Sequence, residues 1–169
     1  KENSLLGGKD MYSGSKAAAE IVLNSYFHSF NIKNKNLLFC TARAGNVIGG
    51  GDWSKNRLIP DIMRAWGKSK KAKIKNSQSI RPWQHVLEPL YGYMKAAYYL
   101  NYKKELNGSS FNFGPSSARS YKVIELIKSL EVLRKHKKQY VIQKKNSFKE
   151  KKILKLNSFK AQKKLNWKT

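Results

Sequence analysis

Two residues near the start of the chain have types and a spacing that could perform acid–base chemistry. Tyr12 and Lys16 stand four residues apart in YSGSKAAAE, residues 12–20. On a helix this spacing puts both side chains on one face, one turn apart. The Lys16 ammonium and the positive end of the helix would both favour the phenolate form of Tyr12. The pattern predicts a tyrosine that acts as a general base. An exposed pair on an ordinary surface helix is the alternative.

The elements that would position this pair alternate between helix and strand. A helix is predicted through Phe30, and LLFCTAR (37–43) reads as a buried parallel strand. The glycine-rich GNVIGGGDW (45–53) would form a loop at the carboxyl end of that strand, where open α/β sheets bind ligands. Further helices are predicted at 57–68, 88–102, 121–135 and 158–165, and extended segments at 72–75, 80–86, 109–115, 139–143 and 153–156. The alternation predicts an α/β fold with a parallel sheet.

Length and composition limit the class of protein. The 169 residues, 40% of them hydrophobic, suit one domain or a piece of a larger protein. No stretch approaches the roughly 20 apolar residues that cross a bilayer, so we expect no membrane partner. Cys40 is the single cysteine and lies in an apolar run, which predicts a buried thiol in a reducing, cytoplasmic compartment. The opening KENSLLGG reads like the middle of a protein, and we expect the chain to be a fragment.

The net charge is +25, with 35 Lys and Arg against 10 Asp and Glu. Such a charge binds polyanions non-specifically at low salt. Lysine dominates, and arginine is not interleaved with aromatic residues as in specific nucleic-acid sites, so we expect no specific nucleic-acid partner. A basic nucleic-acid-binding domain stays the alternative from another functional class. The three histidines and Cys40 lack metal-site spacing, and no metal is predicted.

An ordered series of motifs carries a family resemblance: YSGSK, RAGNVIGGGDW, RLIP, IRPWQHVLEPLYGYM, FNFGP and KLNSFKAQKKLNW. It resembles the extended short-chain dehydrogenase/reductase superfamily and, within it, the CDP-glucose 4,6-dehydratases. The resemblance covers roughly the C-terminal half of such an enzyme. It implies the C-terminal part of a Rossmann-like parallel sheet with a small mixed α/β substrate-binding region. Residues 1–50 and 81–114 would belong to the NAD-binding domain, and 51–80 and 115–169 to the nucleotide-sugar-binding region.

The resemblance also implies a reaction. These lyases use NAD to dehydrate CDP-glucose to CDP-4-keto-6-deoxyglucose in deoxysugar, O-antigen and lipopolysaccharide biosynthesis. Hydride leaves C4 of the sugar, water is eliminated across C5–C6, and the hydride returns at C6. Another NAD-dependent nucleotide-sugar epimerase or dehydratase is the nearest alternative, and a pseudoenzyme is a further one. The complete protein is expected to be a homodimer or tetramer, and the fragment alone to be inactive because the dinucleotide-binding glycines and the elimination acid are missing.

Tyr12 and Lys16 match the catalytic pair of this family. Tyr12 would remove the proton of the sugar 4-hydroxyl, and Lys16 would favour the phenolate and hydrogen-bond the nicotinamide ribose. Both residues are therefore expected to be catalytic and to contact the cofactor.

Six residues match substrate-binding positions of the family. They are Asn46, Arg57, Leu58, Arg81, Asn112 and, with the weakest match, His85. Guanidinium groups suit a diphosphate because their fork pairs two oxygens at once. Other interpretations remain: a turn residue for Asn46, an ion pair with Glu88 for Arg81, a strand-end cap for Asn112, and a structural hydrogen bond for His85.

Overall fold

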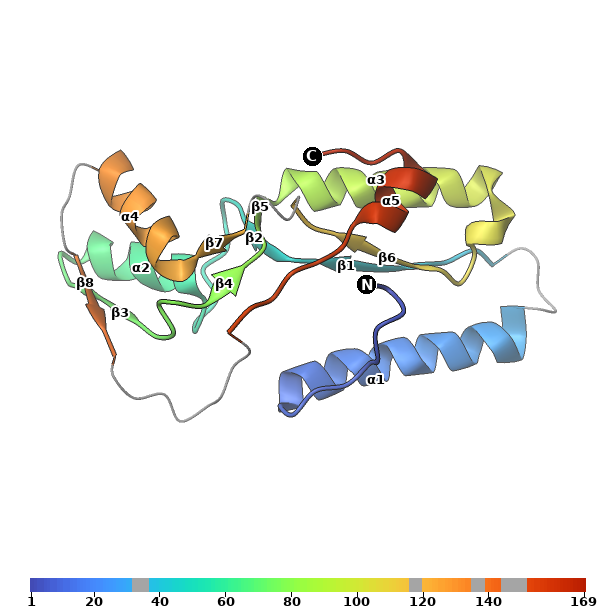
Figure 1. Ribbon diagram of the computed structural model, residues 1–169, viewed down its shortest axis with the longest axis horizontal. Coiled ribbons are helices and arrows are strands. Elements are labelled where there is room, and N and C mark those ends of the chain that lie inside the picture. The colour runs from blue at the N-terminus through green and yellow to red at the C-terminus, as the bar shows by residue number, and fades with distance from the viewer. Residues whose placement is uncertain (32–36, 116–119, 135–138, 144–151) are drawn as a thin grey trace. The chain divides into compact units, whose positions relative to one another are not determined.

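The chain forms two compact units (Figure 1). The computed structural model describes residues 1–31, 37–115, 120–134, 139–143 and 152–169. Unit 1 comprises Lys1–Ala44, Glu88–Phe113 and Asn157–Thr169, and unit 2 comprises Gly45–Leu87 and Gly114–Leu156. These boundaries follow packing, whereas the domains expected from the resemblance follow function. The functional division stays a prediction.

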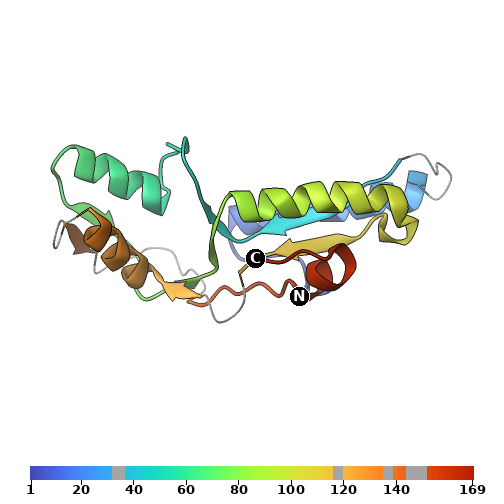
Figure 2. The same cartoon turned by 90° about the horizontal axis from the view of Figure 1, so that it is seen from above.

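Unit 1 is built around two parallel strands with helices on both sides. The strands β1 (Thr41–Ala44) and β6 (Ser110–Phe113) pair in register from Thr41 with Ser110 to Ala44 with Phe113. The helical elements are α1 (Met11–Tyr26), the π-helical η1 (Phe27–Asn31), α3 (Leu87–Tyr102), the 3-10 helix η2 (Lys104–Leu106) and α5 (Phe159–Leu165). Helix α1 lies on one side of the strand pair and α3 on the other (Figures 1 and 2).

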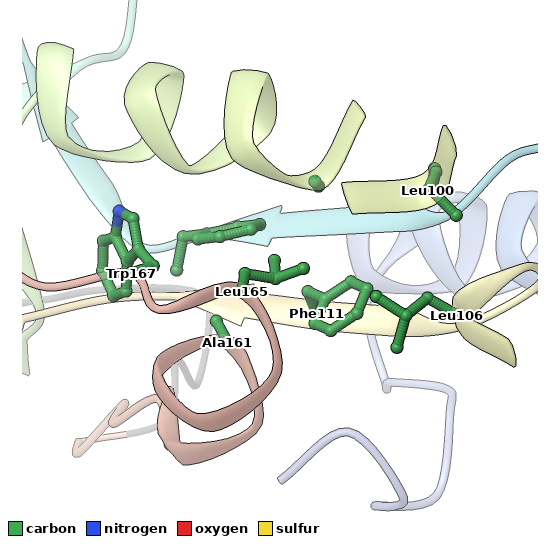
Figure 3. Packing of buried hydrophobic residues seen from close by; sticks show 8 residues of the cluster. Leu100, Leu106, Phe111, Ala161, Leu165 and Trp167 are labelled. Atoms are coloured by element: carbon green, nitrogen blue, oxygen red, sulfur yellow. The ribbon is translucent and has the colours of Figure 1, made fainter. Parts of the chain in front are cut away.

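The core of unit 1 joins residues from its second and third segments (Figure 3). Its buried members are Ala96, Leu100, Leu106, Phe111, Phe113, Ala161, Leu165 and Trp167. The indole of Trp167 packs edge-on against Phe113 at 5.3 Å between ring centroids. Its Nε1–H donates to the carbonyl of Glu88 at 3.1 Å, which satisfies the one polar atom of a fully buried side chain.

The described residues of unit 2 form two helices and three pairs of short strands. The helices are α2 (Leu58–Gly67) and α4 (Val123–Leu133). The parallel pairs are β2 (Asn46–Ile48) with β5 (Trp83–His85) and β3 (Ala72–Ile74) with β8 (Tyr140–Ile142), and the antiparallel pair is β4 (Ile80–Arg81) with β7 (Tyr121–Lys122). Both helices pack on β3 through a core of Ile62, Trp66, Ala72, Ile74, Val123 and Ile127. The parallel pairs and flanking helices confirm the predicted α/β class.

Two predicted strands are shorter than expected. The strand predicted at 37–43 begins only at Thr41, because the side chain of Asn107 forms hydrogen bonds with the backbone of the residues before Thr41. Asn107 Oδ1 accepts the N–H of Phe39 at 2.9 Å, and its Nδ2 donates to the carbonyl of Leu37 at 3.1 Å. In the segment predicted at 153–156, only Ile153 forms a bridge, with Ile80.

Local boundaries differ in three other places. The first residues of the predicted glycine-rich loop form β2, which pairs with β5. The helix predicted from residue 121 begins at Val123, because the two residues before it form β7. Ser158, where the helix predicted at 158–165 begins, is the N-cap of α5, but its side chain makes no capping hydrogen bond.

Candidate active site

Helix α1 presents Tyr12 and Lys16 on one face, as their spacing predicts. The Lys16 Nζ lies over the ring of Tyr12, 5.5 Å from its centroid. Tyr12 is 71% exposed, and Lys16 is exposed as well. Both residues lie at the N-terminal end of α1, where the helix dipole favours negative charge. The phenol and the ammonium are therefore adjacent and open to a ligand.

Asp10 fixes where this helix begins. Its carboxylate accepts the backbone N–H of Ser13 at 2.9 Å and the hydroxyl of Ser13 at 2.7 Å. These hydrogen bonds, the backbone one first, hold the pKa of Asp10 below its ordinary value of 3.8. The cap satisfies an N–H that the first turn of a helix leaves unpaired. Sequence analysis missed Asp10, although an Asp three residues before a Ser at a helix start is a recognisable capping pattern.

Asn112 is the predicted site residue in β6. It is 1% exposed, and its Nδ2 donates to the carbonyl of Asn157 at 3.3 Å. Its backbone N–H donates to the Glu2 carboxylate at 3.1 Å. Within the described part of the chain, Oδ1 is buried without a hydrogen-bond partner. Asn112 therefore combines a packed position with one free acceptor.

Cys40 lies in unit 1 just before β1. It is half-buried and packs at the edge of the unit 1 core, which agrees in part with the expected buried thiol. Burial raises the pKa of its thiol above the ordinary value, and the nearby Lys160 charge opposes that shift. The neutral thiol is therefore the favoured form.

Asn46 and His85 lie on the paired strands β2 and β5 of unit 2. Asn46 is opposite Trp83 and Ile48 is opposite His85, and side chains two residues apart on a strand share a face. The exposed His85 accepts the N–H of Leu87 through Nδ1 at 3.3 Å. This contact fits the structural interpretation of His85. The pairing places Asn46 and His85 on the same face of the two strands.

The three glycines after β2 meet different constraints. A Cβ on Gly49 would lie 2.5 Å from Cγ1 of Val86, so only glycine allows the backbone to pass there. Gly51 has φ of +83°, a left-handed conformation that favours glycine. A Cβ on Gly50 would meet nothing within 4 Å. Close packing and backbone conformation therefore explain two of these three glycines.

Arg57 is paired within the segment that follows the glycines. Its Nε lies 3.6 Å from Oδ2 of Asp52, and both side chains are largely exposed. Asp52 Oδ1 also accepts the N–H of Ser54 at 2.9 Å. Hydrogen bonds from Ser54, and then the charges of Arg57 and Arg64, hold the pKa of Asp52 below its ordinary value. An exposed ion pair of this length is weak, so Arg57 can exchange Asp52 for another anion.

Arg64 anchors the same segment to α2. Its guanidinium donates to the carbonyls of Trp53 at 2.5 Å and Ser54 at 3.1 Å, and it pairs with Asp61 one turn earlier on the helix. Sequence analysis did not single out Arg64. Its spacing from Asp61 indicates an ion pair, but nothing in the sequence indicates contacts with two carbonyls of a loop.

The remaining predicted residues of unit 2 are more enclosed. Arg81 in β4 is partly buried, and its Nη1 donates to the carbonyls of Ile80 at 3.0 Å and Lys152 at 3.5 Å. Leu58 begins α2 and packs against the unit 2 core. Among the described residues, no group of three His, Cys, Asp or Glu side chains is placed to hold a metal ion.

The exposed face of Tyr12 and Lys16 is chemically suited to NAD. A hydroxyl and an ammonium together provide donors and acceptors for ribose hydroxyls. Within the described residues Lys16 has no carboxylate partner, so its charge is available to a ligand.

No described helix is long and apolar enough to span a membrane.

Comparison with known proteins confirms the resemblance to CDP-glucose 4,6-dehydratase. The chain is 40% identical over 171 residues to the CDP-glucose 4,6-dehydratase of Salmonella typhimurium strain LT2. The match covers 99% of this chain and 48% of that protein, so the chain spans about half the length of its curated relative. No protein-family model matches the chain.

Solved structures confirm the fold. The dTDP-glucose 4,6-dehydratase DesIV of Streptomyces venezuelae, with NAD and TYD bound, superposes with a TM-score of 0.82 at 16% identity, over 99% of this chain and 48% of that one. The dTDP-glucose 4,6-dehydratase of Bacillus anthracis, in complex with NAD, gives a TM-score of 0.76 at 20% identity, with coverage of 99% and 49%. The UDP-glucuronic acid 4-epimerase of Bacillus cereus, with UDP-glucuronic acid and NAD, gives 0.79 at 18% identity, with coverage of 99% and 52%. The chain therefore has the α/β fold predicted from its sequence, with part of a Rossmann-like sheet.

Proposed function

We propose that the chain is the C-terminal part of an NAD-dependent nucleotide-sugar 4,6-dehydratase that acts on CDP-glucose. The observation that carries the proposal is the placement of the Lys16 ammonium over the Tyr12 ring at the start of α1. The 40% identity to a CDP-glucose 4,6-dehydratase supports the choice of substrate. The product would be CDP-4-keto-6-deoxyglucose, used for deoxysugars of the lipopolysaccharide O-antigen, and the enzyme would work in the cytoplasm.

Tyr12 would take the proton of the sugar 4-hydroxyl, because an alkoxide-like carbon releases hydride readily. Lys16 would stabilise the phenolate form of Tyr12 that accepts this proton, and it would hold a ribose hydroxyl of the cofactor. NAD supplies the acceptor of the C4 hydride and later the hydride that is delivered to C6. Asp10 would position Tyr12 by fixing the first turn of α1.

The substrate contacts that we propose follow the six positions that match the family. Arg57 forms an exposed ion pair with Asp52, and it would exchange this partner for a diphosphate oxygen. Arg81 would bind another, since a guanidinium has five donors and can keep its backbone contact. Asn46 would hold a sugar hydroxyl or a diphosphate oxygen, and Asn112, which matches an asparagine of the family, would lie near the diphosphate. Leu58 would lie along the nucleotide, and His85 has the weakest claim to contact the substrate.

The test uses the complete protein that contains this chain, incubated with CDP-glucose and NAD. Formation of the 4-keto product, followed by its ultraviolet absorbance, is the expected result. Tyr12→Phe should lower turnover by about 10²–10⁴-fold because the general base is lost. The matched control is Tyr102→Phe, a change at a tyrosine of α3 that is 71% exposed, as Tyr12 is, and it should leave turnover unchanged.

Two outcomes would contradict the proposal in different ways. Equal activity of the Tyr12→Phe and Tyr102→Phe variants would remove Tyr12 as the base. Conversion of UDP- or dTDP-glucose in preference to CDP-glucose would leave the dehydratase proposal standing and overturn the base specificity. An interconversion of sugars without a 4-keto product would favour an epimerase, a class also present among the structural neighbours.

We also propose that the complete protein forms a homodimer or tetramer. Helix α1 has a single buried residue, Ala17, and exposes Ile21, Val22 and Tyr26. These apolar side chains are suited to contact with another helix. The isolated chain is expected to be inactive, and dehydratase activity from it alone would contradict that expectation.

A further inference from the structure

Unit 2 carries a row of lysines that its proposed catalytic function does not use. The segment from the end of α2 to the end of β3 contains five lysines within eight residues: Lys68, Lys70, Lys71, Lys73 and Lys75. All five are exposed. The described residues of unit 2 contain fourteen Lys and Arg and four Asp and Glu, a difference of +10. The row therefore lies in a strongly positive field.

The alternation of β3 directs these lysines to one face. Ala72 and Ile74 are 2% and 1% exposed and belong to the core that α2 and α4 build on one side of the strand. Successive side chains of a strand point to opposite faces, so Lys73 points away from that core. Lys71 and Lys75, which flank β3, are exposed as well. Both helices lie on the same side of the β3–β8 pair (Figure 1). The opposite side is a lysine face.

The backbone that carries this face is well ordered by hydrogen bonds. The N–H groups of Lys68 and Lys70 donate to the carbonyl of Ala65 at 3.1 and 2.9 Å. The ladder with β8 is closed at both ends, by Ala72 N–H to Gln139 O and by Gln143 N–H to Ile74 O, each at 2.9 Å. The lysines therefore project from a fixed strand and turn, which limits the entropy that a bound ligand must overcome.

Acidic side chains of the described residues do not neutralise the row. The ion pairs found among these residues all use arginine: Arg43–Glu20, Arg57–Asp52 and Arg64–Asp61. The other described acidic residues of unit 2 form hydrogen bonds with the backbone. Glu125 accepts the N–H of Lys122, and Glu131 accepts the N–H of Gln139. The five ammonium groups are therefore available to an external anion.

The arrangement favours a linear polyanion over other anionic partners. The residues from Lys71 to Lys75 include β3 and span at most about 13 Å, over which one strand of duplex DNA presents about four phosphates. Val141, opposite Lys73, is the apolar residue of β8 on this face, so the face offers little to insert into a lipid bilayer. It also lacks the arginine and aromatic side chains that read bases. We propose that the lysine face binds the phosphate backbone of nucleic acid without sequence selectivity.

Fluorescence anisotropy with a labelled duplex of about 20 base pairs tests this proposal, since the logarithm of the binding constant falls by about 0.9 per phosphate contact for each decade of salt. Replacing Lys71, Lys73 and Lys75 by Gln should make this salt slope shallower by about 2.7 and weaken binding at least about tenfold at low salt. Two duplexes of unrelated sequence should bind equally well.

The control removes the same charge elsewhere. Lys9, Lys104 and Lys168 are exposed lysines of unit 1, and replacing them by Gln should change the slope by less than about 1. Equal losses in the two triple variants would mean that net charge alone drives binding, and would overturn the proposal. So would binding to vesicles of anionic phospholipid without binding to the duplex. Circular dichroism of both variants establishes that they fold, and neither variant changes a residue of the proposed active site.

Discussion

Among single residues, Asp10 sets the first turn of α1 and with it the place of Tyr12. The cap hydrogen bonds are stronger to the ionised carboxylate than to the neutral acid, which is why the pKa of Asp10 lies below 3.8 in the folded chain. A group whose pKa is depressed by folding stabilises the fold above its unfolded pKa and loses that effect as the pH falls. The start of the proposed catalytic helix is thus sensitive to acid.

Replacing Asp10 by Asn should make the stability of the chain less dependent on acid. Asn keeps a capping oxygen but has no carboxylate to protonate. The difference in melting temperature between about pH 6 and about pH 3 should therefore be smaller in Asp10→Asn than in the unaltered chain. Thermal unfolding followed by circular dichroism measures this. The same acid dependence in both proteins would contradict the assigned cap.

At this scale the sequence was most informative where a local rule applies. The four-residue spacing of Tyr12 and Lys16 predicted their shared face, because helical geometry alone determines it. The contacts of Arg64 with Trp53 and Ser54 were not predictable, since they depend on how a loop without regular structure folds back on α2. The roles of Asn46, Arg57, Leu58, Arg81, Asn112 and His85 in substrate binding stay predictions.

Among the elements, the passage from β2 into the glycine-rich loop depends on a close backbone approach. Gly49 passes Val86 where a Cβ would clash at 2.5 Å, whereas Gly50 is in open space. The two adjacent glycines therefore form a matched pair for mutation.

Gly49→Ala should destabilise the chain by about 1–3 kcal/mol, because the added methyl group must displace β2 or Val86. Gly50→Ala should change the free energy of unfolding by less than about 0.5 kcal/mol. Urea denaturation of the two variants measures the difference. Equal effects would show that packing against Val86 does not select glycine at position 49.

The boundaries of strands were less predictable than those of helices. Helices α2 and α3 begin and end within one residue of the predicted ranges, because apolar periodicity and Pro60 mark them. The first half of the strand predicted at 37–43 is absent, because its backbone is hydrogen-bonded to the side chain of Asn107, which lies about 70 residues later in the chain. Such a competition between a side chain and a strand ladder leaves no local pattern in the sequence.

In the molecule as a whole, the chain alternates between the two units. Unit 1 takes its three segments from the beginning, the middle and the end of the sequence. Its last segment supplies Ala161, Leu165 and Trp167, all fully buried. The order of elements in the sequence predicted the α/β class, whereas the division into packed units depends on contacts between segments that are distant in the chain.

Trp167→Ala should destabilise unit 1 strongly. It removes a buried indole, its contact with Phe113 and its hydrogen bond to Glu88, and such truncations cost about 3–5 kcal/mol. Phe159→Ala on α5 is the control, because Phe159 is exposed and should cost less than about 0.5 kcal/mol. Chemical denaturation gives both values. If Trp167→Ala lowered the free energy of unfolding no more than Phe159→Ala does, the last segment would not be needed to hold unit 1 together.

The position of Trp167 has a consequence for how the protein is made. The strand that begins at Thr41 and the helix that begins at Leu87 leave the ribosome long before the indole that completes their core. Domains usually fold as they emerge, starting from the N-terminus. Here β1 and α3 are made before the residues that complete their core, so a nascent chain would expose Phe111 and Phe113 until synthesis passes residue 167. A chaperone that shields aromatic segments during translation would therefore raise the yield of folded protein.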